Sequence, residues 1–98
     1  MITKPIPNAL RFYRKQAGLR QVDVAARLGF TSYDRISHWE NGLSFPSVTN
    51  LFRLSALYKV PADDLYREFV KVLSASVPIH EEPKTYAQPP SDLLSVVL

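Results

Sequence analysis

QVDVAARLGFTSYDRISHWENG, residues 21–42, is the stretch that decides how this chain folds. Apolar residues recur at helical spacing on both sides of Gly29. They are Val24, Ala25 and Leu28 before the glycine, and Ile36 and Trp39 after it. Glycine is favoured just past a helix C-terminus, because it takes positive φ without a Cβ penalty. We therefore expect one short helix over residues 21–28 and a second that starts after Thr31-Ser32 and ends at Asn41.

Working outward, the segment before this stretch predicts another helix over residues 8–17. Gly18 ends it, and Asn8 is the expected N-cap. The inward residues of this helix are expected to be Leu10, Tyr13 and Ala17.

Two further helices are predicted after Gly42. The fourth begins at Pro46-Ser47, with Ser47 as N-cap, and the fifth opens at residues 60–64, where Pro61 suits a first helical turn. The fourth should present Val48, Leu51, Leu54 and Tyr58 to the core. The fifth carries two stripes, one of Leu65, Phe69 and Val72 and a second of Tyr66, Val70 and Leu73. These patterns predict an all-α domain of five helices over residues 1–75.

The character of the chain changes at Ser76. Four of the eight prolines lie between residues 77 and 90, which excludes a regular helix there. We expect residues 76–98 to form an extended or flexible Pro-rich tail whose apolar end, residues 93–98, is suited to dimerisation or to binding a partner.

Composition limits the function further. The 98 residues include no cysteine, so disulfides and thiolate metal sites are excluded. Residues 1–7 lack the apolar region of a signal peptide, and no apolar run approaches the about 20 residues of a membrane span. We expect a soluble, cytoplasmic protein. Residues 1–60 hold nine basic and three acidic side chains, and residues 61–98 hold three basic and six acidic ones, so a basic body precedes an acidic end.

The two helices around Gly29 leave one face of the second helix free. An α-helix fits the major groove of B-DNA, where hydrogen-bonding side chains can distinguish the base pairs. Such side chains occupy the start of this helix, at Ser32, Tyr33, Asp34 and Arg35, and the position one helical turn later, at His38. Arg35 is suited to a bidentate contact with guanine, and Asp34 to accepting from cytosine N4.

These residues resemble the lambda-repressor/Cro-type (XRE) helix-turn-helix family. The resemblance covers about residues 8–67 and rests on a combination of positions: Gln21, Ala25, Gly29, Ile36 and the run Glu40-Asn41-Gly42. It implies a five-helix domain that binds operator DNA as a dimer and usually represses transcription.

The resemblance also implies roles for individual residues. Gln21 would contact a phosphate and brace the reading helix, whereas the start of that helix and His38 would face the bases. The loop 41–47 would hold the sugar-phosphate backbone, and Arg11 and Glu40 would form a structural pair. With the exposed cations, the expected DNA-binding residues are Lys4, Arg20, Gln21, Thr31, Ser32, Tyr33, Asp34, Arg35, His38, Asn41, Ser44 and Ser47. Arg14 is a further candidate phosphate neighbour.

Two positions depart from the family pattern. Phe30 to Ile36 is one residue longer than the usual turn, which leaves the register of residues 31–34 open by one position. Lys59 stands where a glycine is usual, a change that should affect only a helix end.

Other functional classes remain as alternatives. The same domain occurs in antitoxins, in which the tail would neutralise a toxin, and a protein-interaction module would use the fold without DNA. The two histidines, His38 and His80, show no catalytic or metal-binding spacing, so we expect no enzyme activity, metal or cofactor. The second stripe on the fifth helix and the apolar end of the tail suggest a homodimer.

Overall fold

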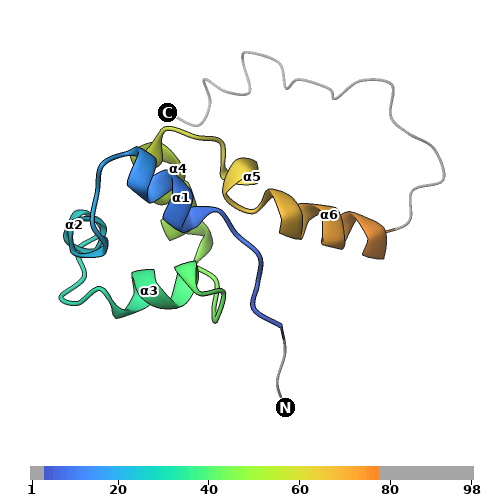
Figure 1. Cartoon of the computed structure of the whole chain (residues 1–98), viewed down its shortest axis with the longest axis horizontal. Helices are drawn as coiled ribbons and strands as arrows, with labels where there is room; N and C mark the ends of the chain where they lie inside the picture. Colours follow the sequence, from blue (N-terminus) through green and yellow to red (C-terminus); the bar gives the residue numbers. More distant parts are fainter. Residues whose placement is uncertain (1–3, 78–98) are drawn as a thin grey trace, which may run out of the picture.

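The computed structural model describes residues 4–77, and the regular secondary structure of this part of the chain is all α-helical (Figure 1). The all-α class expected from the sequence is confirmed. None of the helices in residues 4–77 is long and apolar enough to cross a membrane. The helices are α1 (Leu10–Gln16), α2 (Gln21–Arg27), α3 (Asp34–Glu40), α4 (Val48–Tyr58), α5 (Ala62–Leu65) and α6 (Arg67–Ser76).

The first five helices share one core. Each contributes one of the largest fully buried side chains, which are Leu10, Val24, Ile36, Leu54 and Leu65. The expected inward faces of α2 and α3 are confirmed, because every apolar residue named for them is buried. On α1 the expectation is only partly right. Tyr13 is half-buried and Ala17 is exposed, so the buried face turns from Leu10 toward Arg14.

The expectation that Asn8 is the N-cap of α1 is wrong by one position, because α1 starts at Leu10 and its N-cap is Ala9. Asn8 joins two helices instead. Its Oδ1 accepts from the backbone N–H of Leu10 at 3.1 Å, at the start of α1. Its Nδ2 donates to the carbonyl oxygens of Trp39 at 3.2 Å and Glu40 at 3.3 Å. The last carbonyls of a helix have no partner within the helix, so this amide satisfies groups that α3 leaves open. Asn8 thereby ties the start of α1 to the end of α3.

Helix α4 begins and ends as its sequence suggests, with one exception. Ser47 is its N-cap and accepts from the N–H of Asn50 at 3.1 Å. Lys59 takes a left-handed conformation with φ 60°, which explains why glycine is usual at this position. The expectation that Val48 faces the core is wrong, since Val48 is 69% exposed. Burial starts only one turn later, at Leu51, so the first turn of α4 extends past the core.

The predicted fifth helix is in fact two helices. The chain bends at Tyr66, whose φ of −132° and ψ of 35° are not helical. Tyr66 is buried against Phe45, with 5.1 Å between the ring centroids, and α6 then projects away from the other helices (Figure 1). No residue of α6 is buried. The expected inward position of Val72 is therefore wrong, because Val72 is 60% exposed.

The proposed division between a domain and a tail falls close to the end of the described part. Helix α6 continues to Ser76, the first residue assigned to the tail. The conformation expected for residues 78–98 lies outside the described residues.

Candidate nucleic-acid interface

Helix α3 presents one polar side to solvent. Ile36, Trp39 and Glu40 point into the molecule, and the opposite side of the helix carries Asp34 and His38, both exposed. Successive residues are about 100° apart around a helix, which places Asp34 and His38 near the centre of the outer side. Asn41 directly after α3 is also exposed. Arg35 and Ser37 lie on the two flanks of this outer stripe.

The end of α3 is held by a buried carboxylate, Glu40, whose side chain is 1% exposed. Gln21, the first residue of α2, donates from Nε2 to Glu40 Oε1 at 2.9 Å. Arg11 reaches the same oxygen from Nε at 3.3 Å. This hydrogen bond from Gln21 connects the start of α2 to the end of α3.

Arg14 is the closer arginine partner of Glu40. Its Nε donates to Oε2 and its Nη2 donates to Oε1 at 3.1 Å, so the two planar groups form a bidentate pair. Nη1 donates to the carbonyl of Leu19 at 2.9 Å. The side chain is 9% exposed, whereas that of Arg11 is 52% exposed. The expectation that Arg14 neighbours a phosphate is therefore wrong, because its guanidinium is committed to Glu40.

These partners set the charge state of Glu40. Burial by itself would raise the pKa of Glu40, but the hydrogen bonds from Arg14 and Gln21 and the charge of Arg14 outweigh burial. The pKa of the carboxyl consequently lies below its usual value. Glu40 stays ionised and holds α1, α2 and α3 in one arrangement.

The turn between α2 and α3 is polar and open. Thr31, Ser32 and Tyr33 are all exposed, and Ser32 Oγ accepts from the N–H of Asp34 at 3.2 Å. The longer turn thus ends at Tyr33, and α3 starts at Asp34, which settles the register that the sequence left open. Arg35 turns back over this loop, with its Cζ 4.7 Å from the centroid of the Phe30 ring.

The loop between α3 and α4 follows the C-terminal end of α3. Asn41 Oδ1 accepts from Arg11 Nη2 at 2.9 Å, and Asn41 Nδ2 donates to Ser37 Oγ at 3.3 Å. Ser44 and Ser47 are exposed, although Ser47 Oγ also caps α4. Asn41, Ser44 and Ser47 therefore line one exposed segment next to the outer side of α3.

The two cations expected at the edges of the interface have different surroundings. Lys4 is exposed and precedes a segment that is fixed to the α3–α4 loop by a hydrogen bond from Ile6 N to Gly42 O, 2.9 Å long. Arg20 is exposed and pairs with Asp23, with Nη2 to Oδ1 at 3.1 Å. Exposed pairs of this kind are weak because water screens the two charges, so Arg20 can exchange its partner at little cost.

Sequence reasoning missed Arg14 and Asn8 as organisers of this interface. Arg14 follows the buried Leu10 by four positions, so both lie on the inner side of α1. An arginine at the same helical spacing as core residues indicates a buried ion pair, so the sequence could have predicted the burial of Arg14. The contacts from Asn8 to α3 span more than thirty positions and left no local pattern.

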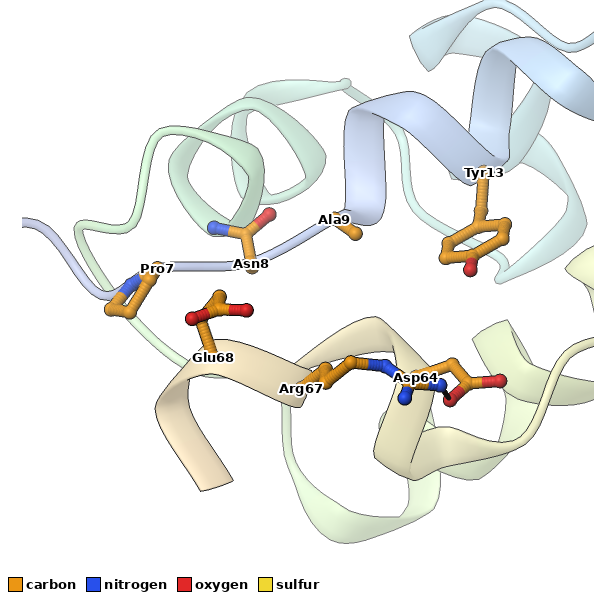
Figure 2. A pocket seen from close by; sticks show the side chains of 7 residues that line it. All are labelled: Pro7, Asn8, Ala9, Tyr13, Asp64, Arg67 and Glu68. Atoms are coloured by element: carbon orange, nitrogen blue, oxygen red, sulfur yellow. Dashed lines mark hydrogen bonds and ion pairs between the residues drawn. The ribbon is translucent and has the colours of Figure 1, made fainter. Parts of the chain in front are cut away.

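A separate hollow of 360 Å³ lies between the N-terminal segment and α5 and α6 (Figure 2). It is lined by Pro7, Asn8, Ala9, Tyr13, Asp64, Arg67 and Glu68. Figure 2 shows the side chains of Arg67 and Asp64 meeting at its edge, where they form an ion pair. Arg67 and Asp64 thus neutralise each other, and Glu68 pairs with Lys71, so each charged side chain of the lining already has a partner. Within residues 4–77, no three His, Asp or Glu side chains gather as a metal site would require.

A family model described as helix-turn-helix matches residues 10–65, which is more than half of the chain. No curated protein matches the chain.

Proposed function

Because the chain belongs to the lambda-repressor-like helix-turn-helix family, we propose that it is a sequence-specific DNA-binding transcription regulator that acts as a repressor. In this proposal a homodimer binds a palindromic operator, and α3 of each copy lies in the major groove. The observation that carries the proposal is the polar outer side of α3, which is free of contacts with the core while Ile36 and Trp39 anchor the inner side.

Base reading is assigned to the centre of that outer side. Asp34 can accept from cytosine N4, and His38 lies one turn further along the same stripe. Tyr33 is 48% exposed at the end of the turn, where its ring can pack on a sugar or on the methyl group of thymine. These three side chains come from one turn and one helix that Glu40 holds in place, so they enter the groove as a rigid unit.

Backbone contacts are assigned to the segments around α3. Hydroxyl, amide and cationic side chains commonly bind phosphate oxygens and fix the register of a protein on DNA. Here the candidates are Lys4, Arg20, Gln21, Thr31, Ser32, Asn41, Ser44 and Ser47. The excess of basic over acidic side chains in residues 1–60 supports association with a polyanion.

Homodimerisation is assigned to α6. This helix projects from the body of the molecule and has no fully buried residue, although Phe69 in its first turn packs against Phe45 with 5.1 Å between the ring centroids (Figure 1). Val70 and Leu73 are 42% and 46% exposed and lie on one side of the helix, and Val77 continues the stripe. Tyr66, which the sequence placed in this stripe, belongs to the core instead. An apolar stripe on a helix without intramolecular cover suits contact with a second copy.

The test is a selection of binding sites from a randomised duplex pool, followed by affinity measurements on the enriched sequence over a range of salt concentrations. We expect a palindromic sequence to be enriched and the affinity to fall steeply with salt, by a slope of about −0.9 for each neutralised phosphate. His38→Ala should relax the preference at one base pair in each half-site. Lys71→Ala, which removes an exposed charge from α6, is the matched control and should change neither property.

The sign of regulation needs a second measurement. The wild-type chain should repress a reporter whose promoter overlaps the selected sequence. The His38→Ala variant should leave expression of the reporter near its level without the protein. Increased expression would contradict the repressor assignment and leave DNA reading intact. If no sequence is enriched and no salt-dependent binding appears, the DNA-binding proposal fails in favour of a protein-interaction role, including that of an antitoxin acting on a toxin alone.

A further inference from the structure

Arg35 does not lie where a base-reading arginine would be expected. It is about 100° around the helix from Asp34 and on the side nearer the α2–α3 turn, whereas Asp34 and His38 occupy the centre of the outer stripe. When a helix lies in the major groove, the residues on its outermost stripe face the bases. The residues on its flanks face the sugar-phosphate backbones that border the groove. The position of Arg35 therefore favours a backbone contact.

The conformation of Arg35 agrees with this position. Its guanidinium lies over the ring of Phe30, with Cζ 4.7 Å from the ring centroid. Phe30 is itself half-buried and packs edge-on against Trp39, with 6.0 Å between the centroids. Stacking fixes the plane of a guanidinium and leaves its edge of N–H donors free. Contact with Phe30 thus keeps the Arg35 side chain next to the α2–α3 turn and away from the outer side of α3.

Arg35 forms one wall of a polar hollow of 270 Å³ at this turn. The other lining residues are Gly29, Phe30, Thr31 and Ser32. Both hydroxyl side chains of the hollow are exposed. The Ser32 oxygen already accepts from the N–H of Asp34, and its O–H remains available to donate outward. Among residues 4–77, no backbone partner is found for the N–H groups of Thr31 and Ser32. The hollow therefore combines a fixed cation with several unused donors, and it presents no carboxylate.

We propose that Arg35, Thr31 and Ser32 together bind one backbone phosphate of the DNA target, with Phe30 as the positioning residue that orients the arginine. This inference rests on the proposed function and replaces the guanine contact expected from the residue type. A phosphate offers several acceptor oxygens in a compact anion, which matches donors that converge from a guanidinium, two hydroxyls and the backbone. A guanine edge presents only N7 and O6, in one plane, and a bidentate guanidinium already engages both acceptors.

The first experiment replaces the phosphates of the selected operator, one at a time, with neutral methylphosphonates and measures binding by wild type and Arg35→Ala. For the wild type, we expect one position in each half-site at which neutralisation weakens binding by about tenfold or more. For Arg35→Ala, binding should be weakened overall, and neutralisation at that position should have no further effect. The slope of affinity against salt should also become shallower by about one for each copy of the chain.

The opposing experiment replaces guanines of the operator with 7-deazaguanine, which lacks the N7 acceptor. We expect the loss at each guanine to be the same for wild type and Arg35→Ala. If one guanine substitution instead loses its effect in Arg35→Ala, and no phosphate does, Arg35 reads a base and the phosphate assignment is overturned. The proposed function survives that outcome. It fails separately if the wild type binds no duplex at all.

The role of Phe30 is tested by Phe30→Leu, which keeps an apolar side chain at the turn but removes the ring. The charge of Arg35 remains, so the salt slope should be retained, while affinity should fall about evenly across operator sequences. Phe30→Tyr restores a ring and should restore affinity. If Phe30→Leu binds as tightly as wild type while both variants show the same thermal unfolding, the positioning role is wrong.

Discussion

At the residue scale, the two arginines that reach Glu40 are not equivalent. Arg14 and Glu40 form a bidentate pair whose side chains are 9% and 1% exposed. Removing one partner of a buried pair leaves the other charge without compensation, which costs about 3–5 kcal/mol. Arg11 adds a single contact to Glu40 from a half-exposed position, and exposed pairs contribute about 0–1 kcal/mol. The structure therefore ranks Arg14 well above Arg11.

A pair of matched variants tests this ranking. Arg14→Met and Arg11→Met keep an apolar stem of similar length and remove the charge. We expect Arg14→Met to lower the free energy of unfolding at neutral pH by about 3–5 kcal/mol and Arg11→Met by at most about 1 kcal/mol. Urea denaturation followed by circular dichroism measures both. Equal losses would mean that the bidentate geometry of Arg14 has no energetic consequence.

The same pair sets a dependence on pH. The pKa of Glu40 is lower in the folded chain than its ordinary value of 4.5, so the stabilisation from this carboxylate is fully present above pH 4.5. It is lost as the pH falls through the lower folded pKa. Unfolding free energies from pH 7 down to pH 3 should therefore decline more steeply for wild type than for Arg14→Met. Parallel curves would show that the pair is not the source of the acid sensitivity.

At the element scale, the N-terminal segment depends on one glycine in the loop after α3. Gly42 has a φ of +74°, and a Cβ built on it would lie 2.5 Å from the carbonyl oxygen and 2.6 Å from the nitrogen of Ile6. Both atoms belong to the backbone, which cannot rotate away as a side chain can. The close approach lets Ile6 N donate to Gly42 O at 2.9 Å, so the segment before α1 packs on the loop after α3.

Gly42→Ala should therefore do more than strain one residue. Gly18 provides the control, since it has the same φ of +74° and no atom within 4 Å of a built Cβ. We expect Gly18→Ala to lower stability by about 1–2 kcal/mol, the cost of a left-handed alanine. Gly42→Ala should lower it further and should abolish the slow hydrogen exchange of the Ile6 amide. Protection of that amide in Gly42→Ala at the wild-type level would contradict the proposed docking.

The elements that sequence predicted well are those whose boundaries are decided locally. Ser47 caps α4 as expected, and the glycine-bounded helices α2 and α3 have their expected buried faces. The failures come from tertiary contacts. The periodicity of residues 62–76 fits one continuous helix, and only the burial of Tyr66 against Phe45 accompanies the bend that separates α5 from α6. The flank position of Arg35 also required the actual start of α3, which the longer turn left open.

At the scale of the whole molecule, the surfaces proposed for DNA reading and for dimerisation are separate. Helix α3 is held to α1 and α2 through Glu40, whereas α6 leaves the body after Tyr66 (Figure 1). A substitution in the apolar stripe of Val70 and Leu73 on α6, which Val77 continues, should therefore change the oligomeric state without altering the arrangement of α3. Two linked reading helices bind neighbouring half-sites about one helical turn apart, so loss of the dimer should weaken binding to a palindrome far more than to a single half-site.

Leu73→Glu tests this separation, with Val72→Glu as its control. The two substitutions are identical in chemistry and adjacent in α6, but Leu73 lies on the stripe with Val70 and Val72 does not. In sedimentation experiments at tens of micromolar, we expect a dimer for wild type and Val72→Glu and a monomer for Leu73→Glu. Leu73→Glu should keep the half-site affinity and lose the extra affinity for the palindrome. If the dimer persists in Leu73→Glu but disappears when residues 91–98 are deleted, the dimer contact lies at the end of the chain and not on α6. If the wild type is a monomer, the homodimer proposal is wrong.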